Sequence, residues 1–87
     1  MAYDVRFKPS AERAFRKLPV DIQRRIARRL DGLAEEPRPP GCEKLAGAER
    51  LYRVRVGDYR VVYEVSEDVL MVLVLVVGHR KDVDRRL

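Results

Sequence analysis

Cysteine and histidine are scarce in this sequence, which holds one of each, Cys42 and His79, and it has no tryptophan. A single cysteine cannot form an internal disulfide, so a reducing compartment, the cytoplasm, is the expected location. One histidine and one cysteine also fall short of the three or four nitrogen and sulfur ligands of a zinc site. We therefore expect no metal centre built by the protein.

Long apolar runs are missing as well. The longest, residues 69–77, is only nine residues, whereas a membrane helix needs about 20. The first eight residues lack the apolar stretch of a secretory signal, so we expect no association with a membrane. A chain of 87 residues supports one hydrophobic core, which predicts a single domain over residues 1–87.

Positive charge, by contrast, is abundant. The chain carries 19 Lys and Arg against 14 Asp and Glu, a net charge of +5, and 15 of the 19 basic residues are arginine. Such a balance favours a polyanionic partner. With 46% apolar residues, the chain is also able to bury a core.

The N-terminal half predicts a strand followed by two helices. Apolar and charged residues alternate over residues 3–8, which is typical of a strand with one buried face. Ser10 is the expected N-cap of a first helix, and Pro19 ends that helix and begins the next. The apolar stripes of the two helices are Ala11, Ala14, Phe15, Leu18 and Ile22, Ile26, Leu30, Leu33.

Three prolines in residues 35–41 interrupt the helical pattern and predict a loop. The period becomes two from Leu51, Gly57-Asp58 marks a tight hairpin, and residues 69–77 read as a central strand covered on both faces. From His79 onward we expect a charged tail. The predicted fold class is α+β with the order β-α-α-β-β-β, a small antiparallel-rich sheet and two antiparallel helices packed on one face.

Four arginines are expected to lie near one another. Arg53 and Arg55 are two apart on one strand and share a face, Arg60 opens the neighbouring strand, and Arg80 follows the central strand. Their mutual repulsion would be relieved by a bound polyanion, and the planar guanidinium fork suits phosphate. An ordinary solvated sheet face is the alternative.

Three segments carry a resemblance to a known family. They are Lys44-Leu45-Ala46-Gly47, the run from Leu51 to Val65 with its core Gly57-Asp58-Tyr59-Arg60, and Val77-Gly78-His79-Arg80-Lys81-Asp82-Val83. Together they resemble the RelE toxins of the RelE/ParE toxin–antitoxin superfamily, and the resemblance covers nearly the whole chain.

The resemblance implies a type II toxin that enters the ribosomal A site and cleaves messenger RNA there. The family's reaction uses no metal or cofactor: the ribose 2′-OH attacks the adjacent phosphate and leaves a cyclic phosphate and a free 5′-OH. By this resemblance Arg53 and Arg55 occupy basic positions that are often lysine, and Arg60 and Arg80 match two family arginines. The implied partner is a small RelB-like antitoxin in a hetero-oligomer.

The sequence departs from the family pattern at two points. Arginine stands where many relatives have lysine on the strand, and arginine is a poor base because its pKa is above about 12. No tyrosine follows Tyr63, although many relatives carry one near the C-terminus. Three alternatives follow. His79 or Asp84 takes over proton transfer, the plane of an arginine side chain stacks on a base in place of the tyrosine, or the nuclease activity is weakened.

Further basic residues are candidates for RNA binding. They are Lys44, Arg24, Arg28, Lys81 and Arg85. The helical arginines at 24, 25, 28 and 29 lie away from the apolar stripe, where they either follow ribosomal RNA phosphates or form an ordinary solvated face. Two other functions remain open at this stage, a ParE-like inhibitor of DNA gyrase and a non-enzymatic module that binds RNA or the ribosome.

Overall fold

The computed structural model describes residues 2–86, and the side chains of residues 2–85. The ends of the expected domain, residues 1 and 87, lie outside this range. The elements are, in chain order, β1 (Asp4–Phe7), α1 (Pro9–Arg16), α2 (Val20–Glu35), β2 (Glu43–Lys44), β3 (Leu51–Val56), β4 (Tyr59–Ser66), β5 (Met71–His79) and α3 (Arg80–Arg86). The predicted α+β fold is confirmed, with β2 and α3 as additions.

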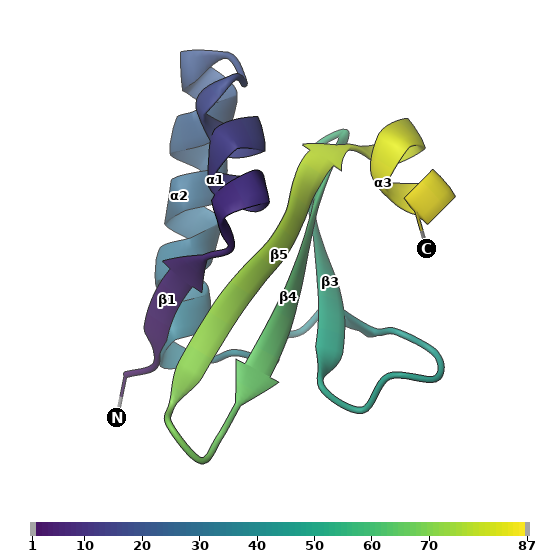
Figure 1. Cartoon of the computed structure of the whole chain (residues 1–87). Coiled ribbons are helices and arrows are strands. Elements are labelled where there is room, and N and C mark those ends of the chain that lie inside the picture. Colours follow the sequence, from purple (N-terminus) through teal and green to yellow (C-terminus); the bar gives the residue numbers. More distant parts are fainter. Residues whose placement is uncertain (1, 87) are drawn as a thin grey trace.

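One five-stranded sheet organises the molecule, in the order β1-β5-β4-β3-β2. β1 runs parallel to β5, and the other neighbours are antiparallel. Helices α1 and α2 lie on one side of this sheet, and α3 lies on the other (Figure 1). We call the side under α1 and α2 the helix face and the opposite side the open face. The described helices include none long and apolar enough to cross a membrane.

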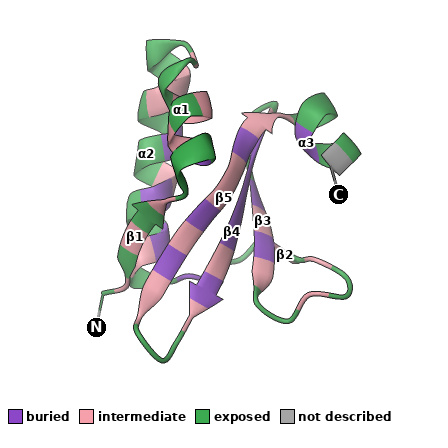
Figure 2. Ribbon diagram, in the orientation of Figure 1, coloured by how far each residue is buried: buried purple, intermediate pink, exposed green. Residues whose placement is uncertain are grey.

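The helix face holds the main core, because alternate residues of each strand point toward the helices. Ile26 and Leu33 of α2 are fully buried, as are Val61 and Tyr63 of β4, and the buried segments follow the sheet beneath the helices (Figure 2). The aromatic rings of Tyr52 and Tyr63 stack with centroids 5.9 Å apart. Packing inside the sheet is therefore the role of both tyrosines.

The first helix begins two residues earlier than predicted. Pro9 occupies its first turn and Lys8 is the N-cap, with no hydrogen bond from a capping side chain, so the expectation of Ser10 as N-cap is wrong. Proline suits this position because its fixed φ is helical and its missing N–H has no partner to lose. The tight connection to α2 is held by Gln23, whose side-chain amide donates to the carbonyl of Leu18 (2.8 Å).

The central strand is less buried than predicted. β5 starts at Met71, since residues 69 and 70 belong to the preceding turn. Val72 and Val74 on the helix face are fully buried, whereas Leu73 is only half-buried. The expectation of cover on both faces is therefore wrong for this part of the strand, because α3 covers only the far end of the open face.

The proline-rich loop is tied to the sheet by two tyrosines. The hydroxyl of Tyr63 donates to the carbonyl of Pro37 (2.6 Å), and the Nε of Arg38 donates to the hydroxyl of Tyr52 (2.9 Å). Burial raises the pKa of Tyr63, so its phenol stays protonated and able to donate. This anchoring directs the chain into β2, which pairs with β3 at Arg53 and Tyr52. β1 forms one edge of the sheet, and β2 partly covers β3 at the other.

The residues after β5 form a helix, so the prediction of a charged tail is wrong. The backbone N–H of Arg80 donates to the carbonyl of Asp58 (2.7 Å), which fixes the start of α3 to the β3–β4 hairpin. Val83 is 1% exposed, and a Cβ added at Gly78 would lie 3.3 Å from its Cγ2 atom. Glycine at position 78 thus allows α3 to pack closely on the open face.

Candidate active site

Three of the four predicted arginines share the open face. Arg53 and Arg55 alternate with the core residues of β3, and Arg60 takes the corresponding position on β4. In the sheet register Arg55 lies directly opposite Arg60, and Arg60 lies opposite Gly78. We call Arg53, Arg55 and Arg60 the open-face arginines.

Arg53 is already held by two carboxylates. Its Nη2 donates to Oε2 of Glu43 (3.1 Å), and its Nη1 donates to Oδ1 of Asp84 (3.0 Å). The side chain is 19% exposed, and its buried Nε has no hydrogen-bond partner. One guanidinium therefore joins strand β2 and helix α3, and a phosphate that binds Arg53 must compete with these carboxylates or lie beside them.

Glu43 also approaches Arg55. The Nε of Arg55 lies 3.6 Å from Oε1 of Glu43, and the Arg55 side chain is 64% exposed. The hydrogen bond from Arg53, followed by the charges of Arg53 and Arg55, holds the pKa of Glu43 below its usual value. An ionised Glu43 reduces the repulsion between the arginines, so these residues do not form the uncompensated cationic cluster that the sequence suggested.

Arg60 is buried, with 7% of its surface exposed. Its Nη1 donates to the carbonyls of Gly57 (3.2 Å) and Tyr59 (3.1 Å), and its Nε has no hydrogen-bond partner. Since Arg60 lies opposite Gly78, over which α3 packs Val83, the C-terminal helix limits access to it. Arg60 thus braces the hairpin and leaves a buried donor directed at no acceptor.

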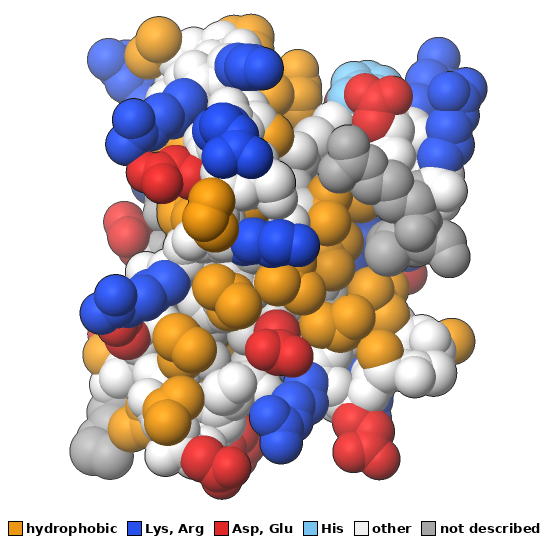
Figure 3. Space-filling model, in the orientation of Figure 1, with side chains coloured by type: hydrophobic (Ala, Val, Ile, Leu, Met, Phe, Trp, Pro, Cys, Tyr) orange, Lys and Arg blue, Asp and Glu red, His pale blue; other side chains and the backbone are white. Residues whose placement is uncertain are grey.

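Arg80 is exposed at the first position of α3, directly after the two residues of β5 that border Arg60 and Tyr59. Lys81 and Arg85 are exposed on the same helix, and basic side chains gather at this end of the molecule beside the histidine (Figure 3). Arg80 contributes positive charge near the open face, without a carboxylate partner among the ion pairs of the described residues.

The two candidates for proton transfer occupy different faces. His79 is paired with Tyr59, its ring lies edge-on to the Tyr59 ring with centroids 5.7 Å apart, and its Nδ1 accepts from the backbone N–H of Lys81 (3.3 Å). Alternation along β5 therefore turns His79 away from the side that carries Gly78 and Arg60. Asp84, in contrast, directly contacts Arg53.

The remaining RNA-binding candidates are dispersed. Lys44 is exposed on β2, where it is paired with Tyr52 of β3. Arg24 and Arg28 are exposed on α2, on the other side of the sheet from Arg53 (Figure 1). These residues do not belong to the open-face arginines.

Sequence reasoning missed Glu43 altogether. Its strand is two residues long and follows a proline-rich loop, so no periodic pattern marks it. Helix α3, in contrast, has a signal in the sequence. Residues 80–86 contain no glycine or proline, and Val83 is their one apolar side chain. A helix that buries this valine also places Asp84 against Arg53.

Comparison with known proteins places this architecture in a family. The family model described as "ParE toxin of type II toxin-antitoxin system, parDE" matches residues 5–83. This chain belongs to the RelE/ParE family of type II toxins. Toxin RelG of Mycobacterium tuberculosis is 36% identical over 90 residues, covering 99% of this chain and 100% of the relative.

Other relatives are of the RelE type. The mRNA interferase toxin RelE of Escherichia coli is 31% identical, over 93% of this chain and 86% of that protein. Among solved structures, the crystal structure of the archaeal RelE-RelB complex from Pyrococcus horikoshii matches with a TM-score of 0.81 and 34% identity, covering 92% of this chain and 97% of that chain. The chain is thus a RelE-type toxin, as its sequence motifs indicated.

Proposed function

We propose that residues 1–87, as one domain, form a ribosome-dependent endoribonuclease that cleaves messenger RNA in the A site and stops translation. The observation that carries this proposal is the gathering of Arg53, Arg55 and Arg60 on one sheet face with Asp84 in contact. Support comes from the relative named mRNA interferase toxin RelE. A protein that acts on translating ribosomes works in the cytoplasm, which is the location that we propose.

The reaction is a transfer within the RNA strand. The ribose 2′-oxygen bonds to the adjacent phosphorus while the bond from phosphorus to the 5′-oxygen breaks, which leaves a 2′,3′-cyclic phosphate and a 5′-hydroxyl. One proton leaves the 2′-hydroxyl and another reaches the departing oxygen, so no net proton is consumed. The charge that builds on the phosphoryl oxygens is what Arg53, Arg55, Arg60 and Arg80 stabilise.

Asp84 is the proposed proton acceptor for the 2′-hydroxyl. Its carboxylate lies 3.0 Å from Arg53, so a phosphate bound by that guanidinium brings the attacking ribose close to Asp84. His79 lies on the other face, beside Tyr59. It would donate a proton to the departing 5′-oxygen only if the RNA extends around the end of β5 to that face. Arginine at the strand positions holds phosphate but does not take a proton at neutral pH.

The partner that we propose is a small RelB-like antitoxin, in a hetero-oligomer. Several solved relatives are toxin–antitoxin complexes, including RelE-RelB from Pyrococcus horikoshii and the intact RelBE complex of Escherichia coli. Acidic side chains of such a partner would bind exposed arginines such as Arg55 and Arg80. Lys44, Arg24, Arg28, Lys81 and Arg85 are proposed as additional contacts to RNA.

The direct test is cleavage during translation in a reconstituted system. Primer extension on messages from arrested ribosomes should show cuts within the A-site codon, and the products should carry a 5′-hydroxyl and a cyclic phosphate. Intact messages at toxin concentrations that arrest translation would refute the nuclease. A non-enzymatic module would bind ribosomes equally well and leave every message uncut.

A second candidate function, inhibition of DNA gyrase, is favoured by the description of the matching family model as a ParE toxin. A supercoiling assay with purified gyrase separates the two functions. Inhibition of supercoiling without cleavage of RNA would support the ParE-like activity, and cleavage without inhibition would eliminate it.

A further inference from the structure

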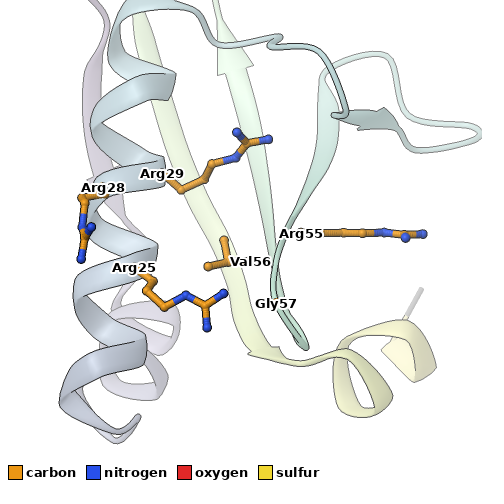
Figure 4. A pocket seen from close by; sticks show the side chains of 6 residues that line it. All are labelled: Arg25, Arg28, Arg29, Arg55, Val56 and Gly57. Atoms are coloured by element: carbon orange, nitrogen blue, oxygen red, sulfur yellow. The ribbon is translucent and has the colours of Figure 1, made fainter.

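A second group of arginines lies between α2 and the β3–β4 hairpin. It lines a pocket of about 540 Å³. The lining residues are Arg25, Arg28, Arg29, Arg55, Val56 and Gly57, and Figure 4 shows them. We call this hollow the α2–β3 pocket. The chemistry proposed above uses Arg55 but none of the three arginines that α2 contributes to this pocket.

Two of these side chains are directed at the sheet. Arg25 and Arg29, four residues apart on α2, reach toward β3, whereas Arg28 does not cross toward it (Figure 4). From the sequence, the four arginines of α2 were expected either to follow ribosomal RNA phosphates or to form a solvated face, and nothing indicated that two of them reach toward the sheet. The guanidinium of Arg25 also fits against the hairpin turn: a Cβ at Gly57 would lie 3.0 Å from its Nη2, and the φ of Gly57 is +59°.

The three arginines that α2 contributes to the pocket carry positive charge without a compensating carboxylate among the described residues. No acidic side chain lines it, and Arg25, Arg28 and Arg29 take part in none of the ion pairs within the described part of the chain. The Nε of Arg29 is buried and has no hydrogen-bond partner. Like charges four residues apart destabilise a helix, so a bound anion would both satisfy a donor and remove this repulsion.

Arg55 lies at the border between the pocket and the open face, and its side chain extends away from Arg25 and Arg29 (Figure 4). It lines the pocket, and it also lies opposite Arg60 and 3.6 Å from Glu43. β2 pairs with β3 only at Tyr52 and Arg53, so within the described residues no strand flanks the outer edge of β3 from Val54 onward. An extended polyanion is therefore able to pass around this edge from one arginine group to the other.

We propose that the α2–β3 pocket binds a phosphodiester of an RNA backbone through Arg25 and Arg29, and that it anchors RNA without taking part in cleavage. The class of ligand rests on the proposed function. Guanidinium groups recognise phosphate through paired hydrogen bonds, and contacts to the backbone position a nucleic acid without reading its sequence. The pocket should accordingly raise affinity for any RNA sequence.

The test compares affinities for a short single-stranded RNA whose riboses are all 2′-O-methylated, so that it cannot be cleaved. The double variant Arg25→Ala/Arg29→Ala should bind roughly tenfold more weakly at about 0.15 M salt, and the slope of log affinity against log salt should become less negative by about 0.7 for each arginine removed. The matched control is Arg13→Ala/Arg50→Ala, which removes the same charge from two exposed arginines that line neither site, and it should change affinity much less.

Two further variants guard against loss of the fold. Arg25→Gln/Arg29→Gln removes the charge but keeps two methylenes and a polar end at each position, and it should show the same loss of affinity with a melting temperature near that of the parent. Arg25→Lys/Arg29→Lys keeps the charge and should retain most of the salt dependence. A folded glutamine variant that binds RNA with the parent's affinity and salt slope overturns the proposal.

Separate measurements on the Arg25→Gln/Arg29→Gln variant show whether the bound phosphate belongs to the message or to ribosomal RNA, and whether the pocket binds a protein instead. Weaker binding to the methylated RNA identifies a contact to the message, whereas weaker binding to ribosomes that carry no message identifies a contact to ribosomal RNA. If both affinities are unchanged while affinity for the purified antitoxin falls, the pocket serves a protein and the proposal is wrong. If the pocket binds RNA but the parent never cuts messages on ribosomes, the proposed nuclease fails and this site remains.

Discussion

The two faces of the sheet are built by the same strands but are held together in different ways. On β3, Tyr52, Val54 and Val56 point to the helix face and are buried, while Arg53 and Arg55 point to the open face and are held by carboxylates. The first set is fixed by local alternation and by the two helices above it. The second depends on partners ten and 31 residues away in the chain. Mutations in the helix-face core should therefore mainly lower stability, and mutations of exposed residues on the open face should mainly lower cleavage.

The largest expected effect is on the open face, where Asp84→Asn removes the proposed proton acceptor. The amide keeps a hydrogen-bond acceptor for Arg53 but takes no proton, so cleavage of the A-site message should slow by about 10²- to 10⁴-fold. Single-turnover cleavage at saturating toxin measures this effect, with thermal unfolding as the check on the fold. Faster cleavage by the variant would mean that Asp84 only restrains Arg53.

The next largest effect is on the free energy of unfolding, and it differs between the buried core of the helix face and the half-exposed apolar residues of the open face. Ile26→Ala on the helix face should lower the free energy of unfolding by about 2–5 kcal/mol, because Ile26 is fully buried. Leu73→Ala on the open face should cost less than about 2 kcal/mol, since Leu73 is half-exposed. Urea unfolding of both variants gives the two values. Equal costs would show that the open face is a second core.

The helix face was more predictable from the sequence than the open face, because its contacts depend on patterns local to each element. The period of two in β3 and the stripe through Ile26 predicted the helix face, because every residue that builds it repeats along its own element. Glu43 and Asp84 were not predictable as partners of Arg53, since ion pairs that join distant segments leave no periodic trace. Asp84 was singled out because the C-terminal tyrosine of many relatives is missing here, whereas nothing in the sequence singled out Glu43.

Arg60 should behave differently from an exposed arginine. It is buried and donates to two carbonyls of the hairpin, so Arg60→Ala should destabilise the protein by about 1–3 kcal/mol as well as reduce cleavage. Chemical denaturation gives the first value and message cleavage the second. Reduced cleavage with the parent's stability would show that the hydrogen bonds to the hairpin contribute nothing to the fold.

The smallest effect concerns Glu43 and pH. Arg53 lowers the pKa of Glu43 in the folded chain, so this carboxylate contributes stability that is fully present above its unfolded-state pKa and is lost as pH falls through the lower folded-state pKa. The parent should therefore melt at a higher temperature than Glu43→Gln at neutral pH, and this difference should shrink in strong acid. A difference that grows on acidification would contradict the ion pair.

The most direct test of an active site on the open face is the rate at which ribosome-bound messages are cut by the parent, by Arg80→Ala and by the control Arg13→Ala. Arg80 is exposed at the start of α3, so its removal should change the stability by no more than about 0.5 kcal/mol. Loss of a group that stabilises the transition state should nevertheless slow cleavage by about 10²- to 10³-fold, while Arg13→Ala cuts like the parent. Equal rates for all three proteins, or no cleavage by the parent, would contradict an active site on the open face.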